Sequence, residues 1–399
     1  MGRGVAITGM GIISAIGNDV AANYKSLIER KSGISRIKKI ETIHKDLLVG
    51  EVDLTNKELE DLLELPSDNN YTRTALLGVI AAKQAVSNAG ITAINDKKTG
   101  LISASSVGGM DITEKYYYQY LEDADTQKYI EAHPIGDSTQ KIAAYLGLEQ
   151  AMTTGISTAC SSGANAIMLG ARLIKSGKLD RVIVGGSDCL SKFTINGFNT
   201  LMILSDDHNT PFDANRKGLN LGEAAAFLVL ESDELVEAEQ KEVLGYVKGY
   251  GNANDAFHQT ASSENGDGAT LAMKKAFDVA GISTDEIDYI NAHGTATENN
   301  DLSEGRAIIR VFGEENVPEF SSTKPYTGHT LAAAGAIEAV YSVLALQNNV
   351  IFPSMNYKTP MEEFSCRPQL DLKEKEINNV LSNSLGFGGN CTSIIFSKV

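Results

Sequence analysis

The sequence predicts an α/β fold built from two similar halves. Segments rich in Val and Ile alternate with segments whose apolar residues recur at helical spacing, which is the pattern of an α/β protein. The first extended segment covers residues 1–9. The chain has 399 residues and no linker rich in Pro, Gly or Ser, so we expect two packed units or one large one.

A first block of sequence occurs twice. Residues 82–90 are typical of a helix that stops at a glycine, and a strand follows over 99–105. Residues 273–281, followed by 287–293, show the same order of helix, glycine and strand. The two copies lie in different halves of the chain.

A second block also occurs twice, after the first one in each half. Residues 156–177 form an extended stretch that runs into a helix, and a strand follows over 181–186. Residues 321–346, followed by 349–353, repeat this pattern. Two blocks in the same order indicate an internal duplication. The alternative is that any two βα units look alike.

The duplication predicts where two functional candidates lie. The first half, residues 1–240, carries Cys160, and the second half, residues 241–399, carries His329. Both residues stand at equivalent helix starts. A pseudo-twofold axis would therefore bring them together in the middle of the molecule.

Composition narrows the class of protein. The net charge of −16 argues against nucleic acid as a partner, although a local basic patch for an acidic protein is still allowed. Four scattered cysteines do not make a disulfide framework, and no CxxC or HExxH spacing supports a metal site. We expect no membrane span and no signal peptide, so the predicted location is the cytoplasm.

Cys160 is the candidate nucleophile. It lies at the apex of a turn of small residues, Thr-Ala-Cys160-Ser-Ser-Gly, just before a predicted helix. Unpaired N–H groups and the positive end of the helix dipole favour a thiolate at such a position. The alternative is a buried structural cysteine.

Two histidines lie in glycine-containing turns. His293 ends a predicted strand in Asn-Ala-His293-Gly-Thr, and His329 precedes a predicted helix in Thr-Gly-His329-Thr. Alone, each histidine would more often be a capping or surface residue. Together with a cysteine at a helix start, they form a candidate catalytic set.

Four segments together resemble the elongating-type β-ketoacyl-[acyl-carrier-protein] synthases. The segments are Thr-Ala-Cys160-Ser-Ser-Gly, Asn-Ala-His293-Gly-Thr-Ala-Thr, Ser-Ser-Thr-Lys324-Pro-Tyr-Thr-Gly-His329 and Asn383-Ser-Leu-Gly-Phe387-Gly-Gly389. The resemblance covers most of the chain. It implies a thiolase-like fold with α-β-α-β-α layers, and a Cys-His-His site.

The resemblance also implies a reaction. Cys160 would accept an acyl group from an acyl carrier protein, with an oxyanion hole made by the backbone N–H groups of Cys160 and Phe387. A malonyl group on a second carrier protein would lose carbon dioxide and attack this acyl group. His293 and His329, as neutral imidazoles, would stabilise the enolate; which of them handles which proton step is left open.

Further roles follow from the resemblance alone. Lys324 and Glu304 would form a supporting pair. Thr295 and Thr297 would hydrogen-bond the phosphopantetheine arm, and Phe387 and Gly388 would form a mobile gate and substrate-binding loop. No further cofactor is implied, because the carrier protein brings the arm. The expected assembly is a homodimer.

Three segments depart from the family pattern. Residues 222–226 read Gly-Glu-Ala-Ala-Ala where the family often has further glycines, and we interpret this segment as structural. Residues 67–70 lack the basic residues on which carrier-protein docking usually relies. Residues 113–140, with their tyrosine cluster, are expected near the acyl pocket and the dimer interface, which leaves chain length and pathway open.

Other functions fit the sequence less well. A papain-like protease is suggested by the 133 residues between Cys160 and His293, but the local signature and any Trp are missing. An NAD-dependent dehydrogenase would need a third glycine where Ser14 stands. A chain-length-determining partner subunit and a thiolase-type or initiating acyltransferase share the implied fold. The first would have lost its nucleophile, and an initiating synthase would have one His and one Asn.

Overall fold

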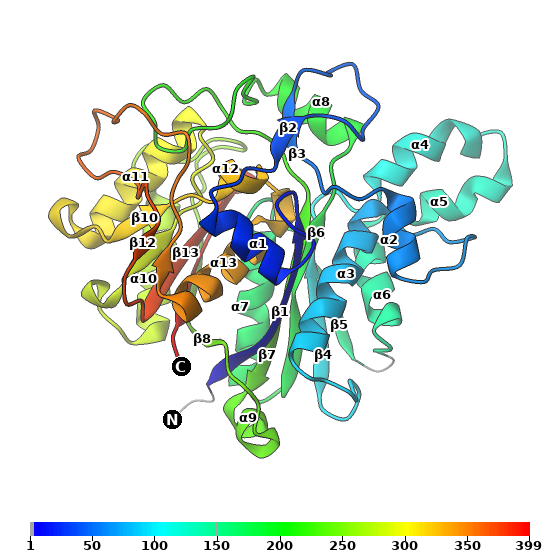
Figure 1. Cartoon of the computed structure of the whole chain (residues 1–399), viewed down its shortest axis with the longest axis horizontal. Coiled ribbons are helices and arrows are strands. Elements are labelled where there is room, and N and C mark those ends of the chain that lie inside the picture. Colours follow the sequence, from blue (N-terminus) through cyan, green and yellow to red (C-terminus); the bar gives the residue numbers. More distant parts are fainter. Residues whose placement is uncertain (1–3, 149–150) are drawn as a thin grey trace.

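A ten-stranded mixed sheet runs through the protein. The computed structural model describes residues 4–148 and 151–399 (Figure 1). The strands follow the order β10-β9-β13-β14-β8-β1-β7-β6-β4-β5. Their bounds are β1 (Val5–Ser14), β4 (Thr99–Ala104), β5 (Met152–Ile156), β6 (Arg181–Asp188), β7 (Ala224–Ser232), β8 (Gly245–Asn254), β9 (Tyr289–Asn291), β10 (Glu319–Ser321), β13 (Asn379–Gly386) and β14 (Asn390–Ser397).

The sheet consists of two halves with the same topology. From the outer edge inward, the first half has the order β5-β4-β6-β7-β1 and the second half has the order β10-β9-β13-β14-β8. In chain order, each of these is the third, second, fourth, fifth and first strand of its half. The outer three strands are parallel and the remaining ladders are antiparallel in both halves. The two first strands, β1 and β8, pair antiparallel and join the halves. The predicted duplication is confirmed.

The first repeated block has the predicted form in both halves. Helix α3 (Arg73–Asn88) precedes Gly90, and α10 (Asp267–Ala280) precedes Gly281. These glycines have φ of 63° and 67°, a left-handed conformation that ends a helix at little cost only for glycine. Strands β4 and β9 then follow.

The second block differs from the prediction in one strand. Helix α7 (Ser162–Lys175) leads to β6, but α13 (Ala334–Asn348) leads to β11 (Val350–Ile351), which pairs only with β12 (Lys373–Glu374) outside the main sheet. Strand β13 takes the place equivalent to β6. The match of 181–186 with 349–353 is therefore wrong. Pro353 cannot donate to a ladder, and the preceding strand has only two residues.

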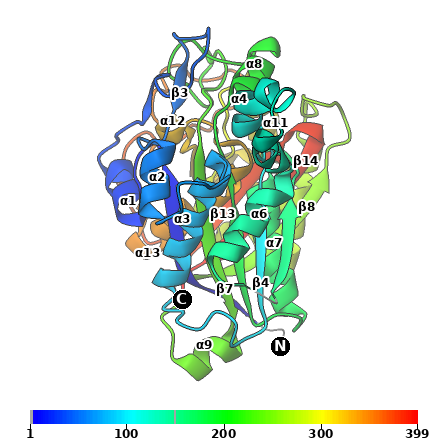
Figure 2. The ribbon, with the colours of Figure 1, turned by 90° about the vertical axis from the view of Figure 1, so that its right-hand side faces the viewer.

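Helices and sheet halves form five layers. Helix α3 and α6 (Ile135–Tyr145) cover the outer face of the first half, and α10 covers that of the second half together with α11 (Glu298–Phe312) (Figures 1 and 2). Helices α7 and α13 lie between the two halves and contact both. The α-β-α-β-α layers of a thiolase-like fold are thus confirmed.

Helices α7 and α13 pack closely at their starts. A Cβ atom on Gly163 would lie 2.8 Å from the backbone nitrogen of Ala336, and one on Gly335 would lie 2.7 Å from that of Ala164. No real side chain tolerates such contacts, so both glycines are needed for this approach. The turns before the two helices therefore meet in the middle of the molecule.

Shorter elements surround these layers. At the end of the sheet where α7 begins lie β2 and β3, α8 and α12, while α4 and α5 project to one side (Figures 1 and 2). Their bounds, with those of the remaining helices, are α1 (Val20–Ile28), β2 (Ile34–Arg36), β3 (Leu48–Gly50), α2 (Asn56–Leu62), α4 (Met110–Tyr120), α5 (Gln127–Glu131), α8 (Lys192–Thr200), α9 (Asp233–Glu239) and α12 (Lys324–Thr327).

One segment is long and apolar enough to resemble a membrane span. Residues Leu331–Asn348 have a mean hydropathy of 1.2 over 18 residues, contrary to the expectation that no run approaches this length. In the structure, 89% of this window is buried. The segment comprises α13 and the turn before it, so its apolar character is that of a helix enclosed between two sheet halves.

Candidate active site

Cys160 lies in the tight turn between β5 and α7. The residue before it, Ala159, has φ of 52°, a strained conformation for a residue with a side chain. The hydroxyl of Ser162 holds the turn, because it accepts the Thr158 N–H at 2.7 Å and donates to the Ala159 carbonyl at 2.6 Å. The turn thus fixes the sulfur at the start of α7.

Burial keeps the Cys160 thiol neutral. Only 5% of the residue is exposed, and desolvation raises the pKa of the thiol to about 11. The Lys324 ammonium and the backbone N–H of Phe387 lower this pKa but do not outweigh burial. The prediction of a thiolate favoured by the helix start is therefore wrong for the free protein.

Two backbone N–H groups converge on the sulfur. Those of Phe387 and of Cys160 itself both lower the pKa of the thiol, as hydrogen-bond donors to it do. Gly386 permits this approach, since a Cβ atom there would lie 2.8 Å from the Thr158 carbonyl oxygen and 3.3 Å from the Cys160 nitrogen. Paired N–H donors of this kind can stabilise a negatively charged oxygen.

The Phe387 ring lies at the cavity that contains the Cys160 sulfur. It stacks on Phe198 of α8 with ring centroids 5.8 Å apart and an angle of 20°. Both rings line the cavity that contains Cys160, as do Gly386 and Gly389. Gly388, predicted as a substrate-binding residue, is exposed and is not part of the described lining; its N–H donates to the Gln259 carbonyl at 2.7 Å.

His293 and His329 lie next to each other beside Cys160. Their ring centroids are 5.3 Å apart and the rings are nearly perpendicular, at 86°. Desolvation, with a contribution from the Lys324 charge, holds both pKa values well below the usual 6.5; His329 further lowers that of His293. Both imidazoles are therefore neutral, as expected.

The hydrogen bonds of the two rings define which nitrogen carries the proton. The Nδ1 atom of His329 accepts the Leu331 N–H at 3.1 Å. The Nδ1 atom of His293 lies 3.2 Å from Lys324 Nζ, and an ammonium group can only donate. In both neutral rings Nε2 consequently carries the hydrogen and is available as a donor.

Lys324 is fully occupied by three acceptors. Besides His293 Nδ1, its Nζ atom donates to the His293 carbonyl at 2.5 Å and forms an ion pair with Glu338. Lys324 and Glu338 are 2% and 1% exposed. The lysine therefore orients the His293 ring and is itself held by a buried carboxylate.

Glu304 supports the backbone of His293. Its two carboxylate oxygens accept the backbone N–H groups of His293 and Gly294, each at 2.9 Å. Glu304 thus holds the turn that carries His293, and the ion-pair partner of Lys324 is Glu338. Lys324 and Glu304 thus both support His293, from its ring and from its backbone, without forming an ion pair with each other. Burial raises the pKa of each of the two glutamates to about 7.

Thr295 and Thr297 lie side by side on the cavity wall. Their hydroxyl oxygens are 2.9 Å apart, and both residues line the cavity. The Asp301 carboxylate accepts the N–H groups of Thr295 and Ala296 and so fixes this turn. The two hydroxyls are therefore presented as a fixed polar pair.

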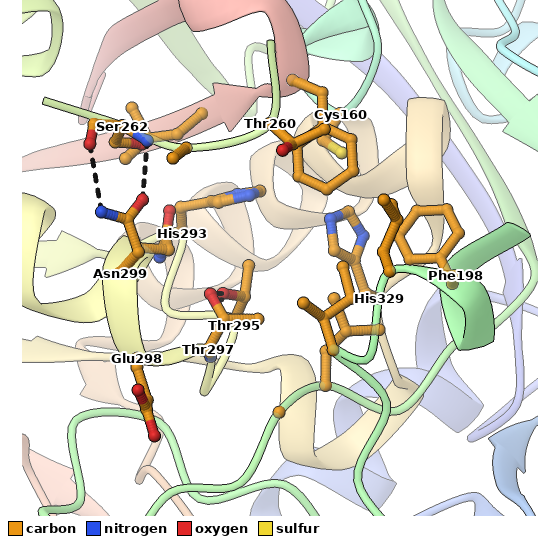
Figure 3. A pocket seen from close by; sticks show the side chains of 18 of the residues that line it. Cys160, Phe198, Thr260, Ser262, His293, Thr295, Thr297, Glu298, Asn299 and His329 are labelled. Carbon is orange, nitrogen blue, oxygen red and sulfur yellow. Dashed lines mark hydrogen bonds between the residues drawn. The ribbon is translucent and has the colours of Figure 1, made fainter. Parts of the chain in front are cut away.

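A cavity of about 360 Å³ unites these groups. Figure 3 shows Cys160, His293 and His329 around the same space, with Thr295 and Thr297 below His293. Among the lining residues, the backbone of Ser262 is hydrogen-bonded to the Asn299 side chain (Figure 3). Within the described ranges, no cluster of three His, Cys, Asp or Glu side chains could hold a metal ion.

Two supporting groups were not found from the sequence. Glu338 is the only charged residue in residues 331–346, and a lone carboxylate in an apolar helix signals a buried partner. The Asn390 side-chain oxygen accepts from Ser161 Oγ and Asn165 Nδ2 at 2.8 Å and from Asn252 Nδ2 at 2.9 Å. This network joins the Cys160 turn to the Phe387 loop, and no sequence pattern indicates these hydrogen bonds.

Two of the divergent segments contribute no residue to the described cavity lining, although the Gly222 N–H donates to the His329 carbonyl at 2.9 Å. Glu223 accepts two hydrogen bonds from the buried Arg73 guanidinium, at 2.8 and 2.7 Å, which confirms that residues 222–226 are structural. Residues 113–140 form most of α4, all of α5 and the start of α6. Tyr116 of α4 stacks on Tyr129 of α5, with ring centroids 4.1 Å apart. None of residues 113–140 is in the described cavity lining; their place at an acyl pocket or dimer interface stays a prediction.

Comparison with known proteins agrees with this fold and site. Residues 2–235 match the family "Beta-ketoacyl synthase, N-terminal domain", and residues 244–358 match "Beta-ketoacyl synthase, C-terminal domain". The chain is 34% identical to 3-oxoacyl-[acyl-carrier-protein] synthase 2 of Staphylococcus aureus strain N315, over 99% of this chain and 98% of the relative.

Solved structures of ketosynthases superpose over the whole chain. The ishigamide ketosynthase/chain length factor covers 100% of both chains with a TM-score of 0.92 and 29% identity. The ketosynthase ApeO in complex with its chain length factor ApeC from Xenorhabdus doucetiae has a TM-score of 0.87 and 31% identity, over 100% of this chain and 98% of that one. The type II system AntDE:AntF, a ketosynthase with its acyl-carrier protein, has a TM-score of 0.86 and 26% identity over 100% of both chains.

Fold and site thus define a thiolase-like condensing enzyme of the acyltransferase type. Within that class, the chain belongs to the β-ketoacyl synthase family.

Proposed function

We propose that this protein catalyses the decarboxylating Claisen condensation of an acyl group with malonyl-acyl carrier protein, giving a 3-ketoacyl-acyl carrier protein. One observation carries the proposal: a thiol, two backbone N–H donors and two neutral imidazoles with N–H groups share one cavity. The identity to a 3-oxoacyl-[acyl-carrier-protein] synthase supports the same reaction.

In the first half-reaction, Cys160 Sγ attacks the carbonyl carbon of the acyl thioester. The new C–S bond forms, the bond to the phosphopantetheine sulfur breaks, and the thiol proton ends on the departing sulfur. The N–H groups of Cys160 and Phe387 stabilise the oxyanion that exists between these events. No external base is needed, because proton donor and proton acceptor are the two sulfurs that exchange the acyl group.

In the second half-reaction, the malonyl group loses carbon dioxide and its electron pair forms an enolate. The Nε2 hydrogens of His293 and His329 stabilise the enolate oxygen, which is a task for neutral donors. The enolate carbon then attacks the acyl carbon on Cys160; a C–C bond forms and the C–S bond breaks. The Cys160 sulfur leaves as a thiolate and takes a proton from solvent water, which balances the negative charge left when carbon dioxide departed, and the cycle closes.

The remaining residues position these groups. Lys324 orients His293 and Glu304 fixes its backbone, while Thr295 and Thr297 bind the amides of the phosphopantetheine arm. Phe387 with Gly388 forms the movable loop over the acyl site. The carrier protein brings the arm, so no resident cofactor takes part.

The proposed reaction also implies a partner, a location and a division of the chain. We assign acyl carrier protein as the partner, the cytoplasm as the location and residues 1–240 and 241–399 as the two halves. A homodimer is supported by β5, an edge strand whose residues are all at least partly exposed. Fatty acid, polyene and polyketide elongation would all use this site.

The Cys160→Gln variant tests the function. It should lose condensation by about 10⁴-fold or more, as nucleophile removal does in other covalent enzymes, yet keep decarboxylating malonyl-carrier protein. Carbon dioxide release and product mass report the two steps separately. Condensation by this variant at the wild-type rate would remove Cys160 from the mechanism, and no 3-ketoacyl product from wild type at any chain length would remove the assignment.

A further inference from the structure

A loop with a net positive charge interrupts the acidic surface of this protein. Residues 36–47, here called the cationic loop, carry Arg36, Lys38, Lys39, His44 and Lys45 against two acidic residues, Glu41 and Asp46. The chain as a whole carries a net charge of −16. Arg36, Lys38, Lys39 and Lys45 are all exposed.

The cationic loop is fastened to the walls of the Cys160 cavity. Ile37 and Ile40 pack against the apolar cluster that contains Leu219, and Phe198 packs against the same cluster. Leu219 and Phe198 both line the cavity. Figures 1 and 2 show the loop between β2 and β3 at the same end of the molecule as α8. The loop therefore packs behind the wall of the cavity that α8 helps to form. This wall reaches the surface, since Met202, just after α8, lines the cavity and is 88% exposed.

The loop is also held in one shape. The Glu51 carboxylate accepts the backbone N–H groups of Lys38 and Lys39, each at 2.8 Å. His44 Nε2 lies 3.1 Å from the Asn196 side-chain oxygen of α8. These contacts use backbone and imidazole atoms, so they leave the ammonium groups of the loop free to face solvent.

Part of the positive charge has no acidic partner. Arg36 pairs with Asp46 at 3.5 Å, and Lys39 pairs with Asp53 at 3.2 Å. Among the described residues, no ion pair is found for Lys38 or Lys45 of the loop, nor for the exposed Lys192 at the start of α8.

The described lining of the cavity contributes no net positive charge. Its two charged residues are Glu298 and Lys217, and Lys217 lies 3.9 Å from Asp207. The unpaired positive charge next to this wall of the cavity is thus that of the loop and of Lys192 at the start of α8. A partner with a matching acidic face would be steered to one orientation.

We infer that the cationic loop, together with Lys192, is the docking surface for an acidic face of the carrier protein. This inference rests on the proposed function, because only a carrier-bound substrate requires a protein beside the cavity. It also accounts for residues 67–70, which lack basic side chains: the positive charge for docking stands on a different element. Nucleic acid is disfavoured as the occupant by the strong net negative charge of the chain.

The test compares two acyl donors on a charge-reversal variant. The variant Lys38→Glu with Lys45→Glu should acylate Cys160 from acyl-carrier protein about tenfold more slowly at low salt, as loss of electrostatic steering predicts. The difference should narrow in 0.5 M salt, on the order of the concentration at which exposed charges are screened within a few ångströms. An acyl N-acetylcysteamine thioester, which has no protein, should react with the variant as with wild type.

A matched control carries the same charge change elsewhere. Lys178, in the turn after α7, and Lys274, on α10, are exposed, and the variant Lys178→Glu with Lys274→Glu should react with both donors like wild type. An equal loss in this control, or an equal loss with the small thioester, overturns the docking surface. If wild-type Cys160 is acylated by neither donor, the proposed function itself fails.

Discussion

Helices α7 and α13 occupy equivalent places in the two halves, yet they support different chemistry. The buried residues of α7 carry no charge, and its start is tied down by the neutral amide and hydroxyl groups of Asn165, Ser161 and Asn390. Helix α13 contributes the buried Glu338, which pairs with Lys324 behind His293. The duplicated scaffold thus places a neutral thiol on one side of the cavity and a charged support for imidazoles on the other.

Of the tests that separate the two sides of the cavity, the largest effect is expected on the imidazole side. His329→Ala or His293→Ala should each slow malonyl decarboxylation by about 10²–10³-fold, which is typical for the loss of one donor to a developing oxyanion. Carbon dioxide release from malonyl-carrier protein measures this step. His133→Ala, an exposed histidine away from the cavity, is the control. Unchanged decarboxylation in both cavity variants would contradict the division between the two sides.

The charged cluster predicts a pH dependence of stability. Burial raises the pKa of Glu338 from 4.5 to about 7, so the folded protein holds a proton that the unfolded chain releases. This carboxyl therefore lowers the free energy of unfolding as pH rises from about 4.5 to 7. Glu338→Gln should remove that decline.

The comparison of the two proteins isolates this effect. Denaturant unfolding of wild type and Glu338→Gln at several pH values gives a difference in which the histidines cancel. Their pKa values are lowered, so in both proteins they make stability rise with pH up to about 6.5. Glu242→Gln, at an exposed position, is the matched control. A constant difference for Glu338→Gln would show that this carboxyl is already ionised at pH 5.

On the α7 side of the cavity, we expect the Cys160 thiol to be unreactive in the free protein. Because burial raises the pKa of Cys160 to about 11, alkylation by iodoacetamide should increase with pH up to about that value. Mass spectrometry of the peptide that contains Cys160 gives the rate at each pH. The unfolded chain, with an ordinary thiol pKa of about 8.5, is the reference. A midpoint below pH 8 in the folded protein would mean that the thiolate predicted from the sequence is present after all.

The smallest expected effect distinguishes two glycines of the Phe387 loop. Gly386→Ala would bring a methyl group against Thr158 and Cys160, so acylation should slow by about tenfold through a displaced Phe387 N–H. Gly388→Ala has open space but a φ of 80°, so it should cost about 1 kcal/mol of stability and little acylation rate. Equal acylation rates of the two variants would argue against the contribution of the Phe387 N–H.

The sequence predicted the fold from local signals that the structure retains. Left-handed glycines at 90 and 281 ended the helices as expected, and the alternation of strands and helices gave the duplicated halves. The strand after α13 was misassigned, because its true counterpart β13 lies some thirty residues further along, after an irregular segment. Local patterns cannot show which distant strand fills a gap in a sheet.

The sequence predicted the reacting groups of the site, but not all of the residues that hold those groups in place. Cys160, His293 and His329 stand in recognisable turns, whereas the partner of Lys324 is set by packing between helices that sequence spacing does not reveal. The expected thiolate was wrong for a related reason. Helix position can be judged from sequence, but the degree of burial, which decides the pKa of Cys160, depends on the Phe387 loop from the other half.

The hydrogen bond from Leu331 to His329 Nδ1 has a consequence for the resting enzyme. With both Nδ1 atoms engaged and both Nε2 atoms already protonated, neither imidazole offers a lone pair to the thiol. The sulfur therefore stays a thiol and reacts slowly with electrophiles and oxidants, because these react with thiolates. It becomes reactive when a thioester brings its own proton acceptor. The protein is in this way protected against damage by the same bonds that orient its histidines.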